Sequence, residues 1–211
     1  MHVERFVFSP IAVNSYILSD ESGECAVIDC GCYDEAEFAT LENYIESSGL
    51  KPVLLLNTHC HLDHIFGNGM FLKRYGLKTR ACREEEANRN NSINHAMLYG
   101  LEMEPPPDIG EYVGDGEELS FGNTTLEAIF VPGHSPGSIS WYCREQGVLF
   151  TGDALFQGGI GRTDLPGGDY DQLIGNIKNR LLTLPPDTLI YPGHGDSTTV
   201  EREVRENPWL I

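Results

Sequence analysis

The sequence has little positive charge and no long apolar run. Only 14 of its 211 residues are Lys or Arg, against 32 Asp or Glu, which leaves a formal net charge of −18. Such a surface repels phosphate backbones and anionic lipid headgroups, so neither nucleic acid nor a membrane is expected as a partner. No stretch approaches the ~20 apolar residues of a transmembrane helix. Residues 1–18 carry charges early and do not resemble a secretory signal peptide.

The six cysteines are scattered and form neither a CxxC pair nor a regular disulfide framework. Thiols placed in this way, in a chain without a secretion signal, are typical of a reducing compartment, and we expect a cytoplasmic location. Cys30 and Cys32 flank a glycine and are a weak candidate for a metal or redox pair. Small buried residues beside a turn glycine are the favoured interpretation.

The length and composition predict one globular domain over residues 1–211. Hydrophobic residues make up 40% of the chain and charged residues 22%, and no linker or low-complexity segment divides it.

Alternating or fully apolar runs predict strands, and apolar residues at helical spacing predict helices. Strands are expected at 2–8, 14–20, 25–31, 52–57, 124–132, 138–143, 147–152 and 188–192. Helices are expected at 33–49, 68–76, 83–100 and 169–184, with a loop at 104–116 and a short terminal helix from about Thr199. The two halves of the chain have similar patterns, which predicts an α/β fold of two mixed sheets with helices outside.

Five of the seven histidines lie just beyond the ends of predicted buried strands. Three of them fall within the six positions 59–64, and later strands end in single polar residues, each preceded by a glycine that lets the backbone turn sharply. Loops at strand ends are where binding sites form in open sheets. The polar residues at these ends are Thr58, His59, His61, Asp63, His64, His134, Asp153 and His194.

Imidazole and carboxylate donors without thiolate predict an open metal site rather than a closed structural zinc site. Seven such donors are too many for one tetrahedral ion, and they suit two ions if one carboxylate bridges them. Zn is the expected metal, and Fe or Mn fits the same donors. Taken alone, His134 or His194 is more often an ordinary loop histidine, and Asp153 a turn former. The run from His59 to His64 is different, because three imidazoles this close gain little in a core.

With these residues in view, the sequence resembles the metallo-β-lactamase superfamily over nearly its whole length. The resemblance implies a four-layer αββα sandwich. Within the superfamily the chain is similar to the glyoxalase II-like hydrolases, and residues 158–169 and 198–210 resemble the short branch that lacks a C-terminal helical domain. The motifs that carry the family resemblance are THCHLDH 58–64, PGHSPGS 132–138, FTGDALF 150–156 and YPGHG 191–195.

The resemblance also implies a role for each of these residues, with two divalent metal ions as cofactors. One ion would be bound by His59, His61 and His134. The second would be bound by Asp63, His64 and His194, with Asp153 bridging both.

Two further residues are implied substrate contacts. Arg162 falls where classical glyoxalase II has a basic residue that contacts glutathione. Asp164 stands where that enzyme has an aromatic residue, which argues against strict glutathione specificity.

The implied reaction is hydrolysis of a thioester, S-lactoylglutathione or a related acyl thiol, by attack of a metal-bridging hydroxide on the carbonyl. The leaving thiolate has a parent pKa of about 8.5, so no strong general acid is needed. Asp63 and Asp153 are the predicted catalytic carboxylates, with Asp63 orienting the water. Thr58 and residues near Ser135 are predicted to support the ligands. The predicted partner is a small-molecule substrate, and a homodimer is left open.

Three other functions fit parts of the pattern. A mononuclear non-haem iron persulfide dioxygenase on the same scaffold would use His59, His134 and Asp153 as two histidines and one carboxylate. The net charge of −18 argues against a nuclease of this fold. The complete set of donors argues against a metal-binding module without catalysis.

The remaining motifs have simpler interpretations. The GGIGRT run at 158–163 lacks the lysine of a phosphate-binding loop, and a solvated active-site loop is expected. The acidic runs at 34–37 and 84–86 predict exposed helix faces. His2 and His95 are expected on the surface.

Overall fold

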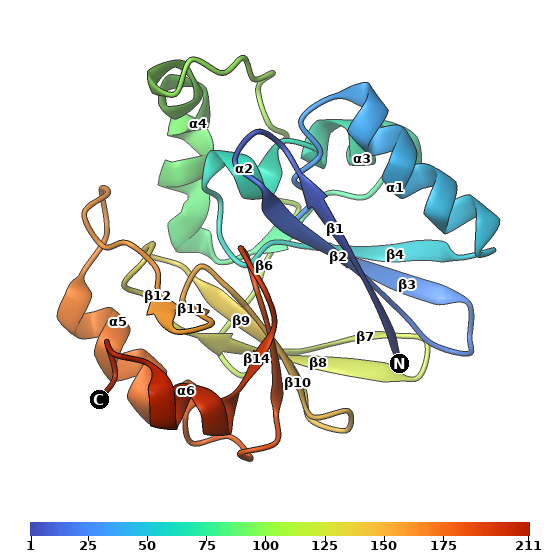
Figure 1. The fold of residues 1–211 in the computed structure, drawn as a ribbon. Coiled ribbons are helices and arrows are strands. Elements are labelled where there is room, and N and C mark those ends of the chain that lie inside the picture. The colour runs from blue at the N-terminus through green and yellow to red at the C-terminus, as the bar shows by residue number, and fades with distance from the viewer.

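Two six-stranded mixed sheets pack face to face in the computed structural model, which describes residues 1–211 (Figure 1). The first sheet has the order β1-β2-β3-β4-β5-β6 and the second β14-β13-β10-β9-β8-β7. The first sheet consists of β1 (His2–Phe8), β2 (Val13–Ser19), β3 (Glu24–Ile28), β4 (Lys51–Leu56), β5 (Arg80–Ala81) and β6 (Glu111–Tyr112). The second consists of β14 (Thr198–Thr199), β13 (Leu189–Pro192), β10 (Val148–Gly152), β9 (Ile139–Cys143), β8 (Thr124–Phe130) and β7 (Glu118–Phe121). A small hairpin joins β11 (Leu155–Phe156) and β12 (Gly159–Ile160).

Helices cover the outer face of each sheet (Figure 1). The first sheet is covered by α1 (Glu35–Ser47) and α3 (Asn68–Tyr75). The second is covered by α5 (Tyr170–Asn176), the π-helical segment Ile177–Leu181 and α6 (Val200–Glu206). At one edge of the molecule, α2 (Leu62–Ile65) lies beside α4 (Glu86–Leu98), which a 3-10 turn (Arg83–Glu85) precedes. The predicted αββα sandwich is confirmed.

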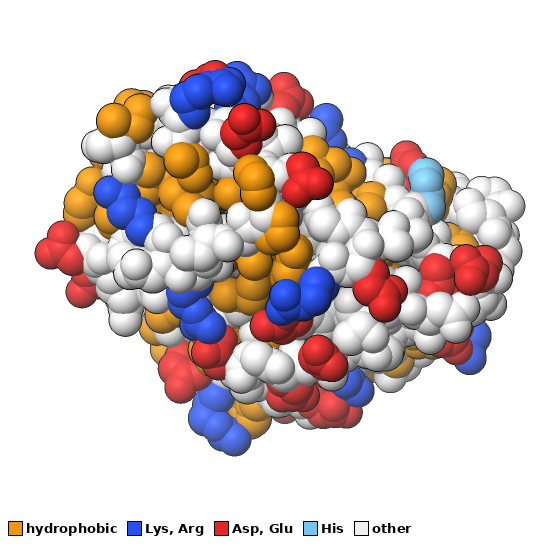
Figure 2. Space-filling model, turned by 90° about the horizontal axis from the view of Figure 1, so that it is seen from below, with side chains coloured by type: hydrophobic (Ala, Val, Ile, Leu, Met, Phe, Trp, Pro, Cys, Tyr) orange, Lys and Arg blue, Asp and Glu red, His pale blue; other side chains and the backbone are white.

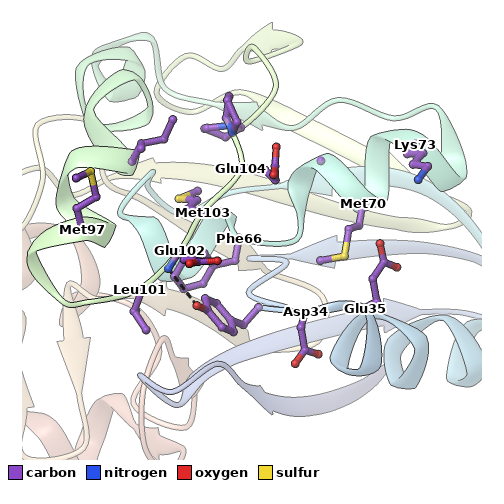
Figure 3. Close-up of a pocket in the computed structure, with 15 residues that line it drawn as sticks. Asp34, Glu35, Phe66, Met70, Lys73, Met97, Leu101, Glu102, Met103 and Glu104 are labelled. Atoms are coloured by element: carbon purple, nitrogen blue, oxygen red, sulfur yellow. Dashed lines mark hydrogen bonds between the residues drawn. The ribbon is translucent and has the colours of Figure 1, made fainter.

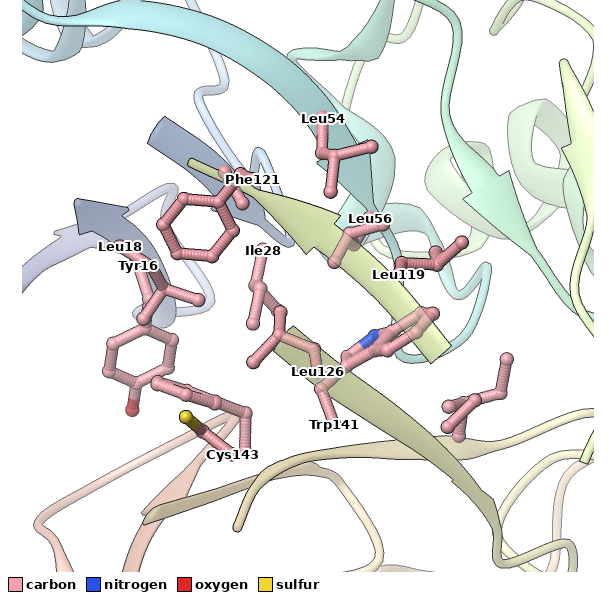
Figure 4. Close-up of a cluster of buried hydrophobic side chains, with 14 of the residues drawn as sticks. Tyr16, Leu18, Ile28, Leu54, Leu56, Leu119, Phe121, Leu126, Trp141 and Cys143 are labelled. Atoms are coloured by element: carbon pink, nitrogen blue, oxygen red, sulfur yellow. The ribbon is translucent and has the colours of Figure 1, made fainter. Parts of the chain in front are cut away.

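Strands that are apolar on both faces contribute side chains to two cores, one between the sheets and one under the covering helices. Successive strand residues point to opposite faces, so Leu54 and Leu56 of β4 join the core between the sheets while Leu55 packs under the helices. Figure 4 shows the core between the sheets, in which Ile28 of the first sheet meets Trp141 and neighbouring side chains of the second. The strand predicted at 52–57 is therefore present as β4, and its residues Leu54 to Leu56 are buried.

Most predicted elements are present, and the differences are local. The helix expected at 83–100 begins as a 3-10 turn and becomes α-helical at Glu86. The helix expected at 169–184 continues from α5 into a π-helical segment. The loop expected at 104–116 contains the two-residue strand β6, and β7 was not predicted.

An uncovered apolar region lies among the charges of the molecular surface. Figure 2 shows apolar side chains gathered on the lower face of the molecule, where α6 and the C-terminal residues lie. The exposed large apolar side chains in this part of the chain are Val204, Trp209 and Ile211. None of the helices combines the length and apolar character that crossing a bilayer requires.

Candidate metal centre

Strand direction brings the candidate ligands to one edge of the sandwich. Strands β10 and β13 are parallel, so Asp153 and His194, which follow them, come out at the same edge. Strand β8 is antiparallel to β9, which is antiparallel to β10, so β8 also ends there, shortly before His134. In the facing sheet, β4 ends at Leu56 and runs into the segment from His59 to His64.

The three-histidine group, made of His59, His61 and His134, converges on one point. His134 Nε2 lies 2.9 Å from His61 Nδ1 and 3.2 Å from His59 Nε2. Nitrogens that bind one tetrahedral ion at about 2.0–2.1 Å lie about 3.3 Å apart, which is close to these separations. All three side chains are buried.

Hydrogen bonds on the far side of two of these rings set their orientation. His134 Nδ1 lies 2.8 Å from the carbonyl oxygen of Arg162, and His59 Nδ1 lies 3.1 Å from Thr58 Oγ1. A carbonyl oxygen only accepts, so His134 donates its Nδ1 proton and directs the lone pair of Nε2 into the site. The predicted support from Thr58 is confirmed.

The mixed group consists of Asp63, His64 and His194. His194 Nε2 lies 3.1 Å from Asp63 Oδ2, and His64 Nε2 lies 3.7 Å from the same oxygen. His194 Nδ1 is 3.1 Å from the carbonyl oxygen of Ala12, which again leaves Nε2 to face the site.

Asp153 lies between the two groups. Its Oδ1 is 3.3 Å from His64 Nε2, and its Oδ2 is 3.7 Å from His134 Nε2 and 3.6 Å from His194 Nε2. One carboxylate therefore faces a histidine from each group.

Unpartnered buried atoms show that a metal ion fits these residues. His64 Nε2 and Asp153 Oδ1 are buried, and although they lie 3.3 Å apart, neither atom makes a hydrogen bond. Leaving such atoms unpaired is costly, and coordination to a cation would satisfy both. The seven side chains thus form a metal-binding His/Asp cluster.

The two groups differ in their electrostatics. Burial lowers the pKa of His59 well below its usual value and that of His61 to about 3, with neighbouring imidazoles adding to the effect. Burial also acts on His64, but the carboxylates of Asp63 and Asp29 outweigh it and raise its pKa well above the usual value. His59 and His61 therefore stay neutral, whereas His64 favours the cationic form.

The cationic neighbours also keep the carboxylates ionised. Burial alone would raise the pKa of Asp153 and Asp63, yet His64 and His194 lower both below the usual value. Ionised carboxylates are the form that binds a metal ion.

Asp29 supports the site and was not identified from the sequence. Its buried carboxylate lies 2.8 Å from His64 Nδ1 and accepts hydrogen bonds from Thr58 N and Thr58 Oγ1, each at 2.7 Å. Asn57 Nδ2 donates to it as well, at 3.2 Å. Asp29 follows the buried strand β3 directly, which is the pattern that identified Asp153.

The three glycines expected before ligand candidates are all required by space. Gly133 has a φ of +135°, and a Cβ there would collide with the backbone of Leu173. Gly152 has a φ of +51°, and a Cβ there would collide with the side chain of Thr58. A Cβ at Gly193 would collide with Asp153 Oδ1. All three positions therefore need glycine, at Gly152 and Gly193 because the site is crowded, as predicted.

The interpretation of the acidic run at 84–86 was wrong for Glu85, although Glu84 is exposed as predicted. Glu85, in the run at 84–86, is fully buried instead of lying on an exposed helix face, because four hydrogen-bond donors surround its carboxylate. Ser135, expected to support a histidine, donates to Glu85 instead. In the run at 34–37, Glu37 is half-buried and accepts hydrogen bonds from two backbone N–H groups.

The remaining candidates lie where the sequence suggested, with one exception. Cys30 and Cys32 are fully buried, as the favoured interpretation expected. His2 is exposed, whereas His95 is half-buried on α4, where it contacts Asn91.

Arg162 and Asp164 pair with each other at the surface. Arg162 Nε and Nη2 donate to Asp164 Oδ1 and Oδ2 at 2.7 and 2.8 Å. This pair occupies the guanidinium and raises the pKa of Arg162, while it lowers the pKa of Asp164 to about 2. Arg162 Nη1 also lies 3.4 Å from the hydroxyl of Tyr99, at the end of α4.

A cavity of about 870 Å³ lies between α1, α3, α4 and the segment 101–106. Figure 3 shows Met70, Met97 and Leu101 among the side chains that line it. None of the seven ligand candidates lines this cavity, although Phe66, two residues after His64, does.

Residues 9–194 match the family model described as the metallo-beta-lactamase superfamily. The chain is 39% identical to the "Probable metallo-hydrolase YqgX" of Bacillus subtilis and 38% identical to the "Hydroxyacylglutathione hydrolase GloC" of Haemophilus influenzae, and each alignment covers 100% of this chain and 98% of the relative. It is 33% identical to the human "Persulfide dioxygenase ETHE1, mitochondrial", over 98% of this chain and 75% of that protein.

Solved structures have the same fold. BLEG-1, described as a B3 metallo-beta-lactamase, superposes with a TM-score of 0.91 at 32% identity, covering 100% of both chains. TTHA1623 in a di-iron-bound form superposes with a TM-score of 0.89 at 35% identity, covering 99% of this chain and 100% of that one.

Proposed function

The chain belongs to the metallo-beta-lactamase superfamily, and from that premise we propose that it is a binuclear metal-dependent hydrolase of a thioester. The observation that carries the proposal is the position of Asp153, whose two carboxylate oxygens face histidines of both groups. A relative described as a hydroxyacylglutathione hydrolase supports the substrate class.

We assign the seven side chains to two divalent ions, most simply Zn²⁺. The three-histidine group would hold one ion and the mixed group the other, with Asp153 shared between them. The di-iron form of the similar TTHA1623 supports two ions and keeps iron as an alternative metal. When bound, two such ions would bring the pKa of water toward neutrality and polarise a carbonyl group.

The carboxylates of the chain would orient the attacking water. Asp63 and Asp153 stay ionised and therefore accept hydrogen bonds from it. The side chains of both, and that of His194, remain partly accessible, at 10, 13 and 25% exposure. Substrate would enter on this side of the site.

A thioester suits the groups around this site. A thiolate leaves without protonation, since the pKa of the parent thiol is about 8.5. The Arg162 guanidinium is held by Asp164, so the thiol need not present an anionic group to it. We therefore keep S-lactoylglutathione and related acyl thiols together as the substrate class, a small molecule rather than a nucleic acid.

The first experiment is metal content followed by turnover. Elemental analysis of chain purified without added metal should find close to two metal ions per chain. Thioester cleavage, followed by release of free thiol, should disappear with a chelator and return with Zn²⁺. The assay should compare S-lactoylglutathione, an uncharged acyl thiol and a β-lactam. Metal-loaded protein that cleaves no thioester would refute the proposal.

A second candidate is a mononuclear iron persulfide dioxygenase. The observation that favours it is that His59, His134 and Asp153 also converge, with His134 Nε2 3.2 Å from His59 Nε2 and 3.7 Å from Asp153 Oδ2. Two histidines and a carboxylate suit non-haem iron, and the human relative is described as a persulfide dioxygenase. One iron per chain, with oxygen uptake on persulfide, would favour this function over hydrolysis.

A further inference from the structure

Glu85 is a buried carboxylate that no step of the proposed reaction uses. It ends the 3-10 turn before α4 and is 0% exposed. Burying an ionised carboxylate is expensive unless hydrogen bonds replace its water, and Glu85 is accordingly surrounded by donors.

Its two oxygens bond to two different loops. Oε2 accepts from the backbone N–H of Cys60 at 2.8 Å and from Asn88 Nδ2 at 2.9 Å. Oε1 accepts from Ser135 Oγ at 2.7 Å and from the backbone N–H of Gly137 at 2.8 Å. One carboxylate thus bridges a loop of the first half of the chain and a loop of the second.

These are the two loops that carry the three-histidine group. Cys60 lies between His59 and His61, and Ser135 follows His134 directly. The contact is tight, because a Cβ on Gly137 would lie only 3.0 Å from the Cγ of Glu85. A shift of Glu85 would therefore change the separation of the histidines.

We propose that Glu85 is a positioning residue that sets the metal affinity of the three-histidine group by holding both histidine loops at their observed separation. The inference rests on the proposed function only in that this group binds a metal ion. None of the hydrogen bonds of Glu85 goes to a side chain of the three histidines, so it would act through the loops.

The variant Glu85→Gln tests this role with little change of volume. A glutamine amide has one oxygen and one NH₂ group, so either orientation turns an N–H donor toward the backbone N–H of Cys60 or of Gly137. Glu203→Gln is a matched control. Glu203 is also buried and accepts from Gly158 N, Thr198 Oγ1 and Asn207 Nδ2, but it contacts neither histidine loop.

Zn²⁺ affinity would be measured by competition with a chromophoric chelator, and the visible spectrum of Co²⁺-loaded protein would report the coordination. In Glu85→Gln, we expect the affinity of one of the two sites to fall by about 10–100-fold, which is typical when a residue behind a ligand is lost. The Co²⁺ spectrum should change with it. In Glu203→Gln, affinity should stay within about twofold of wild type.

Folded Glu85→Gln with wild-type affinity would overturn the proposal, and so would an equal loss in Glu203→Gln. If Glu85→Gln does not fold, Ser135→Ala removes one of the four hydrogen bonds to Glu85, together with the bond between Ser135 and Ser138. That variant should lose at least about threefold in affinity, and unchanged affinity would count against the proposal.

A wild-type chain that binds no Zn²⁺ would refute both this inference and the proposed function. A chain that binds Zn²⁺ without cleaving thioesters would refute the function alone.

Discussion

At the scale of single residues, Asp153 is the side chain on which both proposed metal ions depend. Asp153→Ala removes the one carboxylate that faces both groups, so we expect fewer than two metal ions per chain. Turnover should fall by more than about 100-fold, since even the loss of a residue behind a ligand costs 10–100-fold. Metal analysis and thiol release measure the two effects. Asp187→Ala, at an exposed position before β13, is the control and should match wild type. Full activity in Asp153→Ala would contradict the binuclear assignment.

Asp29 allows a cleaner test of a residue behind the ligands. It has a φ of +52°, a backbone conformation that Asn adopts about as readily as Asp. Asp29→Asn therefore removes the charge beside His64 without straining the backbone. We expect Zn²⁺ affinity at the mixed group to fall by about 10–100-fold, measured by chelator competition. Affinity equal to wild type would show that the carboxylate does not support His64.

At the scale of elements, substitutions in the helix α1 test whether its apolar face stabilises the fold. Its residues Phe38, Leu41 and Ile45 recur at helical spacing and are all buried, as the pattern predicts. Leu41→Ala should lower the free energy of unfolding by about 2–5 kcal/mol, because it leaves a cavity under the first sheet. Urea denaturation measures this change. The neighbouring exposed residue provides a control, Thr40→Ala, for which a change within about 0.5 kcal/mol is expected. Similar losses in both variants would contradict the assignment of this face.

The elements also show what could be predicted from the sequence. The long strands and α1 could be predicted because the spacing of their apolar residues is visible within a short stretch of sequence. Asp153 and His194 could be placed at the ends of strands because they follow such stretches. Strands of two residues, such as β5, β6 and β14, carry no period of their own and exist only because a neighbouring strand pairs with them. Their places could not be derived from local pattern.

The burial of Glu85 could not be predicted from the sequence for a related reason. A run of three glutamates is typical of a solvated helix face. The donors that make burial favourable lie 25 and 50 residues away, at Cys60 and Ser135. Asp29, in contrast, carried a usable signal, because it is polar and ends a buried strand.

At the scale of the whole molecule, the site joins the two halves of the sandwich. His59, His61, Asp63 and His64 follow a strand of the first sheet, and His134, Asp153 and His194 follow strands of the second. Neither sheet alone supplies both groups. A metal ion bound there therefore links the sheets, and its binding free energy contributes to the stability of the fold.

The loss of metal with falling pH should take place in two steps. In the metal-free chain the pKa of His64 is raised well above its usual value and that of His194 is raised, so both imidazoles hold their protons to higher pH and a metal ion must displace them. His59 and His61 have lowered pKa values and are already neutral. Binding at the mixed group therefore weakens as the pH falls, while the three-histidine group is less affected.

Dialysis at constant free Zn²⁺ from about pH 8 to about pH 5, the range in which imidazoles titrate, tests this order. We expect Zn²⁺ per chain to fall from two to one before the second ion leaves. The ion lost first should be the one whose affinity Asp29→Asn lowers most, because His64 is the one ligand that Asp29 contacts directly, and Asp29 reaches His59 only through Thr58. Simultaneous loss of both ions would contradict the electrostatic difference between the two groups. If the ion of the three-histidine group is lost first, the predicted order of loss is wrong. That result would mean that the carboxylates of the mixed group favour its metal ion more strongly than they favour the protons on His64 and His194.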